Sequence, residues 1–338
     1  MKYKAAVLFE QNKLLQVIDI ENEDVGDYQV FVKIQIAGIC GAQINEIKGI
    51  KGPDKFLPHL MGHEGYGEVV IVGNGVTKCK PGDRVVLHWR KSSGKEAQFP
   101  KYNSKNGVIG GGLVTTFSEY SVVSQNRLTV VPPEFDADIG ALLGCALSTS
   151  YGVVKRELRN LTNKKIVILG AGGLGLSIAL LASQEGFEEV VLMDKDASKE
   201  LISKMHGATK YLTHEEFMGK KDKEYEEFCF VDTTGNIEVL EKCYDLAKKS
   251  EIILLGQTKL GSKLTLSDSL KLYSGVSIRF TDGGGFNPDE DIDDFIQRYE
   301  GRLKVFKNLV TDRVSLQEIN LGIEKIMQGK AGRVIVEC

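Results

Sequence analysis

A cluster of glycines stands between two apolar runs, KKIVILG and LGLSIALLASQEG, at Gly170, Gly172, Gly173 and Gly175. In a GxGxxG pattern that joins a strand to a helix, glycines allow a tight turn and let backbone N–H groups approach a pyrophosphate. Asp194 ends the next apolar run, 19 positions after Gly175, where a carboxylate accepts hydrogen bonds from an adenosine ribose. The alternative is a structural turn followed by a surface aspartate. We favour dinucleotide binding, and NAD over NADP because a carboxylate repels a 2′-phosphate, although Lys195 offsets part of that charge.

Cys40, His63 and Cys145 have side chains that bind zinc, but they lie far apart in the sequence. Spacing alone therefore favours the interpretation that these residues bind no metal, and that they are two cysteines of the core and a histidine fixed by a hydrogen bond. Neighbouring cysteines are at least 14 positions apart throughout the chain, so there is no CxxC pair of the redox or zinc-ribbon type.

The composition limits the classes of function that need to be considered. The 338 residues correspond to about two domains at roughly 150 residues each. With 43 basic and 46 acidic residues the formal net charge is −3, so no global charge attracts nucleic acid or an anionic membrane. The N-terminal apolar run before Glu10 is too short for a signal peptide. We expect a cytoplasmic protein with reduced cysteines and small-molecule partners.

Residues 1 to about 135 are expected to be rich in strands. Alternation over residues 30–36 predicts a half-buried strand, and the turn residues Asn74-Gly75 and Pro81-Gly82-Asp83 predict hairpin connections. The polar stretch 89–107 is predicted to be a loop. Its basic residues are either simply solvated or attract an anionic substrate.

From about residue 150, strand and helix patterns alternate, which predicts parallel βαβ units. The uncharged stretch from Ile166 to Gln184 is long enough for a membrane span, but its glycines indicate a strand, a loop and a buried helix. After Gly283 the segments DEDIDDFIQRYEG and SLQEINLGIEKIMQG predict helices, and Arg333 to Val336 predicts a last strand.

Several segments together resemble the zinc-containing medium-chain alcohol dehydrogenases of the medium-chain dehydrogenase/reductase superfamily. They are AGICGAQINEIKG, GHEGYGEVVIVGNGVTKCKPGDRV, LLGCALSTSYG, IVILGAGGLGL and LQEINLGIEKIMQGKAGRVIV, in that order. The resemblance spans essentially the whole chain. It implies an α/β protein with a GroES-like β-barrel catalytic domain at 1–150, completed by 284–338. It also implies a Rossmann NAD-binding domain at 151–283, a doubly wound parallel sheet, with the active site in the cleft between the domains.

The resemblance also implies the ligands of one catalytic zinc. Cys40 in GICG, His63 in GHE and Cys145 in GCALST match the family's ligand positions. Two thiolates and a neutral imidazole leave a fourth tetrahedral position open, as in catalytic rather than structural zinc sites. Glu64 matches an acid that lies beside the metal and can also approach it, and a buried salt bridge is the alternative reading.

Three further positions match residues with roles at the cofactor or the substrate. Thr149 falls where the family packs a threonine against the nicotinamide ring. Arg333 matches an arginine that reaches the pyrophosphate, with an exposed arginine at a strand end as the alternative. Trp89 matches an aromatic wall of the substrate pocket, with core packing as the alternative.

The sequence departs from the family pattern in two regions. No cysteine lies between Asp83 and Cys145, where the family's four-cysteine structural zinc lobe would be, so we expect one zinc and no structural zinc. Around the first ligand, Ala42 replaces a small hydroxyl residue, Gln43 an acid and Asn45 the histidine that commonly ends a proton relay. Gln43 removes one negative charge from the site, and the route of proton release is open.

The resemblance implies an NAD-dependent, zinc-dependent dehydrogenase that interconverts an alcohol and its carbonyl. The polar stretch from Trp89 to Lys95 and the missing zinc lobe favour a polyol, sugar or cyclitol as the substrate. The alternatives are a glutathione-adduct or aldehyde dehydrogenase of the same family, and a catalytically silent nucleotide-binding protein. The apolar strand from Val276 to Phe280 is expected to pair with its copy in a homodimer or tetramer.

Overall fold

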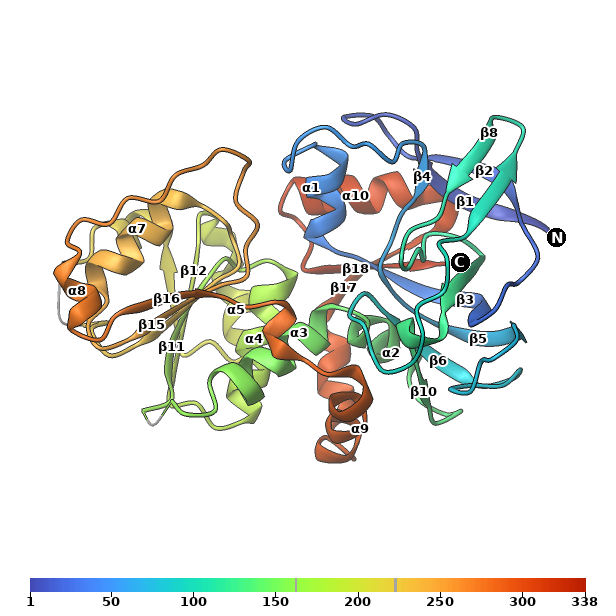
Figure 1. Cartoon of the computed structure of the whole chain (residues 1–338). Helices are drawn as coiled ribbons and strands as arrows, with labels where there is room; N and C mark the ends of the chain where they lie inside the picture. Colours follow the sequence, from blue (N-terminus) through green and yellow to red (C-terminus); the bar gives the residue numbers. More distant parts are fainter. Residues whose placement is uncertain (162, 222–223) are drawn as a thin grey trace. The chain divides into compact units, whose positions relative to one another are not determined.

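The computed structural model describes residues 1–161, 163–221 and 224–338 (Figure 1). The chain divides into two compact units. The barrel unit comprises Met1–Ser148 and Asn287–Cys338, and the parallel-sheet unit comprises Thr149–Phe286. The first division falls inside helix α3 (Ala146–Gly152). The domain boundaries expected from the sequence are residues 150 and 283.

The barrel unit contains a closed barrel and a second sheet. The barrel runs β1 (Lys2–Leu8), β2 (Gln16–Asn22), β7 (Lys101–Ser104), β8 (Gly107–Gly110) and β4 (His59–Leu60). The second sheet runs β10 (Leu128–Val131), β6 (Arg84–His88), β5 (Glu64–Val72), β3 (Gln29–Ile39), β18 (Arg333–Glu337) and β17 (Val310–Ser315), with β9 (Tyr120–Ser124) also paired to β3. Its helices are α1 (Gly41–Ile47), α2 (Ala137–Leu143), α9 (Pro288–Arg298) and α10 (Ile319–Met327). The expected strand-rich barrel domain is confirmed, and so are the two C-terminal helices and the last strand.

Strand β3 contributes to two hydrophobic clusters. Val30, Val32 and Ile34 belong to the larger one, whereas Phe31 packs in a second cluster beneath β1. The predicted half-buried strand is therefore wrong in one respect, because most of β3 is buried on both faces.

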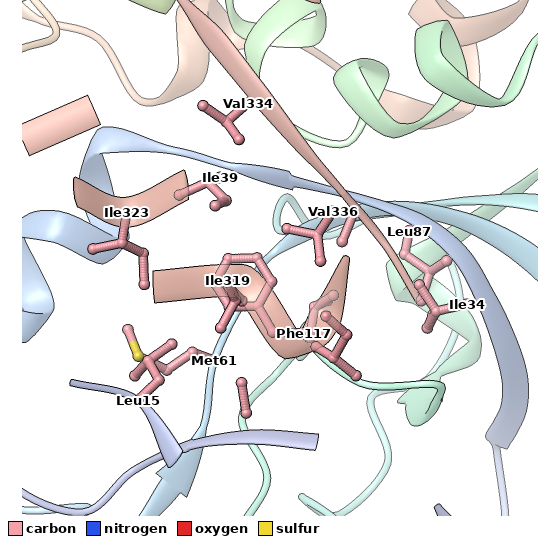
Figure 2. Packing of buried hydrophobic residues seen from close by; sticks show 14 of the residues in the cluster. Leu15, Ile34, Ile39, Met61, Leu87, Phe117, Ile319, Ile323, Val334 and Val336 are labelled. Atoms are coloured by element: carbon pink, nitrogen blue, oxygen red, sulfur yellow. The ribbon is translucent and has the colours of Figure 1, made fainter. Parts of the chain in front are cut away.

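Helix α10 closes the larger cluster. Figure 2 shows Ile319 and Ile323 of this helix beside residues of β3 and β18, including Ile39 and Val334. The helix approaches the sheet closely at Gly322, where a Cβ would lie 2.8 Å from Ile39 Cδ1. This contact joins the last 20 residues of the chain to the N-terminal sheet.

The predicted loop over 89–107 contains a short strand. Within β7 the Tyr102 side chain is buried, whereas its neighbours Lys101 and Asn103 are exposed. Four residues of alternation inside a basic stretch are too few to be recognised from sequence. The strands β5 and β6 pair in antiparallel fashion, as the turn residues between them predict.

The parallel-sheet unit is built as the alternating pattern predicts. Its strands follow the order β13 (Lys210–Thr213), β12 (Glu189–Asp194), β11 (Lys165–Leu169), β14 (Cys229–Asp232), β15 (Glu251–Leu254) and β16 (Ser277–Phe280), all parallel. Its helices are α4 (Gly173–Gln184), α5 (Glu200–Met205), α6 (His214–Met218), α7 (Ile237–Leu246) and α8 (Leu270–Tyr273). The presence of a doubly wound parallel sheet in one unit and a barrel in the other confirms the expected α/β fold class.

The uncharged stretch Ile166 to Gln184 forms β11, the glycine loop and the buried helix α4, as predicted. Within the described ranges no single helix is long and apolar enough to cross a membrane. One bent pair, Ala137–Leu143 with Ala146–Glu157, passes the same test on length and composition.

Candidate active site

Cys40, His63 and Cys145 converge in the barrel unit, although 105 positions separate the two cysteines. Cys40 follows β3 and is the N-cap of α1, His63 directly precedes β5, and Cys145 lies in the turn between α2 and α3. One ligand atom from each residue lies within 4.8 Å of the other two, and the two Sγ atoms are 4.0 Å apart.

This geometry fits a zinc ion. With Zn–S bonds of about 2.3 Å, two thiolates of a tetrahedral site stand about 3.8 Å apart, close to the 4.0 Å observed. His63 Nε2 is buried and has no hydrogen-bond partner in the described part of the chain, so this ring atom is available to a metal. A hydrogen bond from the Cys145 thiol, together with the neighbouring His63 and Arg333, lowers the pKa of Cys40 well below its usual range and favours the thiolate.

In the glycine loop of the parallel-sheet unit, Gly170 and Gly175 contact neighbouring atoms closely, whereas Gly172 borders open space. Gly170 has a φ of +102°, and a Cβ on Gly175 would lie 1.8 Å from the Gly170 carbonyl oxygen. At Gly172, the N-cap of α4, a Cβ would meet nothing within 4 Å. No side chain among the described residues caps this 12-residue helix. Its first N–H groups therefore stand beside open space, which suits a phosphate group.

Asp194 lies at the carboxyl end of β12, next to the glycine loop. Its Oδ2 accepts a hydrogen bond of 2.7 Å from the Ala171 N–H, which fixes the carboxylate against the loop. Lys199 Nζ lies 3.2 Å from the same oxygen. Lys199 is thus a cation beside Asp194, and the partial compensation by Lys195 remains a prediction.

Comparison with known proteins shows which sequences and folds the chain is similar to. A family model described as the alcohol dehydrogenase GroES-like domain matches residues 26–133. The chain is 26% identical over 377 residues to the S-(hydroxymethyl)glutathione dehydrogenase of Haemophilus influenzae, covering 99% of this chain and 97% of that protein. Benzyl alcohol dehydrogenase from Acinetobacter calcoaceticus has the same fold, with a TM-score of 0.85 at 21% identity over 100% of this chain and 99% of its own. Acetophenone reductase from Geotrichum candidum, solved in complex with NAD, gives 0.79 at 22% identity over 100% and 97%.

The chain thus contains an alcohol dehydrogenase GroES-like domain, and it is similar over its whole length to zinc-containing medium-chain alcohol dehydrogenases. It is accordingly an oxidoreductase of a family that uses zinc and a nicotinamide cofactor and acts on small alcohols or their carbonyl compounds.

Gln43 contacts two of the three residues of the candidate zinc site. Its Oε1 accepts a hydrogen bond of 2.9 Å from the Cys40 N–H, and its Nε2 lies 2.7 Å from His63 Nδ1. A neutral imidazole that binds a metal through Nε2 carries its proton on Nδ1 and needs an acceptor there. In the structure the donor Nε2 of Gln43 faces Nδ1, which places the proton of a neutral ring on Nε2. Metal binding through Nε2 therefore requires Gln43 to turn so that Oε1, which has a second lone pair, accepts from Nδ1–H.

Glu64 and Arg333 form a buried ion pair, with Arg333 Nη1 3.3 Å from Glu64 Oε1. The second carboxylate oxygen of Glu64 accepts from the Ala146 N–H at 3.1 Å. Burial raises the pKa of Glu64, while Arg333 opposes that rise. The alternative of an exposed arginine at the strand end is therefore wrong, because Arg333 is buried. Metal binding by Glu64 and pyrophosphate binding by Arg333 remain predictions.

Trp89 follows β6 and is half-buried. Its indole Nε1 is buried without a hydrogen-bond partner among the described residues, and the Arg90 guanidinium lies 5.5 Å from the centre of its ring. The adjacent His88 is unsuited to the role of a base. Its Nδ1 donates to the Arg90 carbonyl and its Nε2 accepts from Thr129, and burial lowers its pKa to about 4.

Thr149 is buried on α3 and belongs to the parallel-sheet unit, so its contact with a nicotinamide ring remains a prediction. Lys199 was not recognised from the sequence. The signal that could have identified it is the turn that begins at Asp196, which carries a lysine five positions after Asp194 back towards the carboxylate.

Proposed function

We propose that this protein is an NAD-dependent alcohol dehydrogenase with one zinc per chain, held by Cys40, His63 and Cys145. The observation that carries the proposal is the convergence of two thiols and an unpartnered buried imidazole nitrogen. Zinc, when bound there, would act as a Lewis acid for the substrate oxygen. We assign residues 1–150 with 284–338 the catalytic role and residues 151–283 the binding of NAD.

The chain's own residues position these groups. Gln43 orients the imidazole of His63, and the pair formed by Glu64 and Arg333 fixes the turn that carries Cys145, through the Ala146 N–H. In the parallel-sheet unit, the first N–H groups of α4 would bind the pyrophosphate, and Asp194 would accept hydrogen bonds from the adenosine ribose.

The substrate class is not fixed by these residues. Side chains of the polar stretch after Trp89 make contacts inside their own unit: Ser92 bonds the Asn126 carbonyl and Lys78, and Lys95 lies 4.8 Å from the Tyr28 ring centre. These contacts account for the polarity of the stretch, so it gives little support to a polyol substrate. The similarity to an S-(hydroxymethyl)glutathione dehydrogenase over nearly the whole chain makes thiol adducts of aldehydes the first class to test.

The test is NAD reduction by the purified protein with a panel containing S-(hydroxymethyl)glutathione, simple alcohols, polyols and sugars. We expect activity with at least one class and one tightly bound zinc per chain.

Cys145→Ala should lose both metal and activity while its circular dichroism spectrum stays unchanged. Cys79→Ala, which changes a half-buried thiol outside the group, should retain both. Two tightly bound zincs, or an active metal-free Cys145→Ala protein, would refute this ligand assignment, and inactivity on the whole panel would favour a silent nucleotide-binding protein.

Cofactor preference is a separate test of the parallel-sheet unit. We expect discrimination against NADP of about 10²-fold, or roughly 2.7 kcal/mol, from repulsion and lost hydrogen bonds at Asp194. Asp194→Ser should reduce this ratio. Equal catalytic efficiency with both cofactors in the unmodified protein would refute the role of Asp194.

We also propose that the protein is a homo-oligomer. Strand β16 is an edge of the parallel sheet and carries the exposed Phe280, and Tyr273 on the preceding helix is exposed as well. An unpaired edge with exposed aromatic side chains is a surface that pairs readily with a second copy.

A further inference from the structure

Glu46, Asp54 and His59 form a second group of metal-binding side chains in the barrel unit. One ligand atom from each lies within 4.8 Å of the other two, and none of them belongs to the group around Cys40. Glu46 lies on α1, Asp54 in the loop that follows, and His59 on β4. The fold thus brings together three segments that share no local secondary structure.

The orientation of the His59 ring is fixed by the backbone. Nδ1 lies 2.7 Å from the Leu60 carbonyl oxygen, and because a carbonyl only accepts, Nδ1 carries the proton. In a neutral ring Nε2 then presents a lone pair, 2.8 Å from Asp54 Oδ2 and 3.7 Å from Glu46 Oε1. The residue as a whole is only 8% exposed. Three electron-rich atoms that face one another in this way require a cation between them, either a proton or a metal ion.

The two carboxylates are held differently. Asp54 Oδ1 accepts a hydrogen bond of 2.8 Å from the Phe56 N–H, which leaves Oδ2 directed at His59. For Glu46 the structure shows one ion-pair partner within the described residues, His59 at 3.7 Å. Partial burial and the neighbouring Asp54 raise the pKa of Glu46, while His59 opposes that rise.

We propose that Glu46, Asp54 and His59 bind a divalent cation through two carboxylate oxygens and one imidazole nitrogen. With bonds of about 2.1 Å, adjacent donors of an octahedral ion lie about 3 Å apart, between the 2.8 and 3.7 Å separations observed. An Nδ1–H that donates to a carbonyl is the usual outer support of a metal-bound histidine. Mixed oxygen and nitrogen donors suit an ion such as Mn²⁺, with water completing its coordination.

The position of the group suggests what the cation does. Helix α1 begins at Cys40, and β4 ends three residues before His63. A cation bound to both elements and to the intervening loop would fix the segments that carry two of the proposed zinc ligands. The binding itself does not depend on the proposed dehydrogenase function, because it uses different donors.

The test uses Mn²⁺ alone as the probe, on the full chain loaded with one equivalent of zinc, so that the thiolate group is filled and the group around His59 stays open to Mn²⁺. Thiolates select zinc, whereas Mn²⁺ prefers oxygen and nitrogen donors, so the probe reports on this group rather than on the cysteines. Electron paramagnetic resonance of free Mn²⁺ should show uptake of one ion per chain. Glu46→Gln and Asp54→Asn should each weaken binding at least about tenfold. Glu68→Gln is the matched control, because it removes the same charge from a side chain of the same unit with 40% exposure against 43% for Glu46, and it should bind as the unmodified chain does.

Absence of Mn²⁺ uptake up to about 1 mM would overturn the proposal, and would show that a proton rather than a metal joins His59 to the carboxylates. Equal uptake by the Glu46→Gln and Glu68→Gln proteins would also overturn it, because the ion would then bind elsewhere. Thermal unfolding of the unmodified protein gives a readout that needs no variant: its midpoint should rise on addition of Mn²⁺, and an unchanged midpoint would count against the site.

Discussion

At the scale of single residues, the proposed zinc site is close to electrically balanced. Two thiolates offset a divalent ion, the buried charge of Glu64 is offset by Arg333, and the neutral Gln43 contacts His63. No uncompensated carboxylate touches these ligands among the described residues. We expect this balance to favour ionisation of the substrate hydroxyl, which compensates for a proton relay that lacks its hydroxyl at Ala42 and its histidine at Asn45.

Gln43→Asp should raise the apparent pKa that controls alcohol oxidation. A carboxylate about 5 Å from the ionising hydroxyl, at an effective dielectric constant near 20, opposes a second negative charge by roughly 3 kcal/mol, or about two pKa units as an upper bound. Since oxidation uses the deprotonated hydroxyl, the pH–rate curve should move to higher pH. The measurement is the pH dependence of NAD reduction with zinc content confirmed, and Gln43→Asn is the neutral control. An unchanged or lower pKa in the aspartate variant would contradict the charge argument.

Arg333→Met should destabilise the protein by about 3–5 kcal/mol, because it leaves the buried Glu64 carboxylate without its cation. The double variant Glu64→Gln/Arg333→Met should recover most of this loss in the free energy of unfolding, measured by chemical denaturation. Arg84→Met, which breaks the more exposed pair with Glu68, should cost less than about 1 kcal/mol. If the single variant at Arg333 cost no more than the variant at Arg84, the buried pair would not have the role described here.

At the scale of elements, the local patterns were predicted well and the long-range ones were not. The strand, loop and helix around Gly172 could be predicted because turn residues and periodicity are local signals. The short strand at Lys101–Ser104 was missed because it is defined by its partners in the barrel. Spacing alone could not unite Cys40 with Cys145, since sheet topology brings them together, and only the family resemblance indicated the pair. Lys199 was missed because the direction of a side chain after a strand depends on the turn that follows.

Two glycines of one loop should respond differently to the same substitution. Gly175→Ala places a Cβ 1.8 Å from a backbone oxygen, so we expect a loss of about 1–3 kcal/mol of stability. Gly172→Ala meets nothing in the protein and has an extended backbone, so its stability should be nearly unchanged. Its affinity for NAD should nevertheless fall about tenfold or more, about 1.4 kcal/mol, because the methyl group occupies space reserved for the pyrophosphate.

Thermal unfolding and NAD titration of both variants provide the measurement. We expect Gly175→Ala to lower the unfolding temperature and Gly172→Ala to weaken NAD binding without lowering that temperature. A Gly172→Ala protein that binds NAD as tightly as the unmodified chain would place the pyrophosphate elsewhere.

At the scale of the whole molecule, the parallel sheet ends in β13 and β16, and each of these strands has one edge that no other strand of the described residues pairs with. Near β16 the surface is also aromatic, through Phe280 and Tyr273, whereas β13 has the sequence KYLT and only Leu212 of its residues is buried. Sheets with exposed, apolar edges tend to associate edge to edge, and proteins that remain monomeric protect them with charge. Of the two edges, β16 is thus the one that we expect to contact a second copy.

Phe280→Lys should therefore convert the oligomer into a monomer without unfolding it. A lysine on an edge strand opposes pairing with the same strand of another copy, since two like charges would be buried together near the two-fold axis. Phe280 is 70% exposed in the single chain, so the substitution removes little packing within it. The matched control is Leu201→Lys on α5 of the same unit, where a 72% exposed side chain lies away from the edge strand. Mass measurement by light scattering after gel filtration should give a monomer for Phe280→Lys and the unmodified mass for Leu201→Lys. A monomeric unmodified chain, or a Phe280→Lys protein that keeps its mass, would show that β16 is not the contact, and the β13 edge would then be the next to examine.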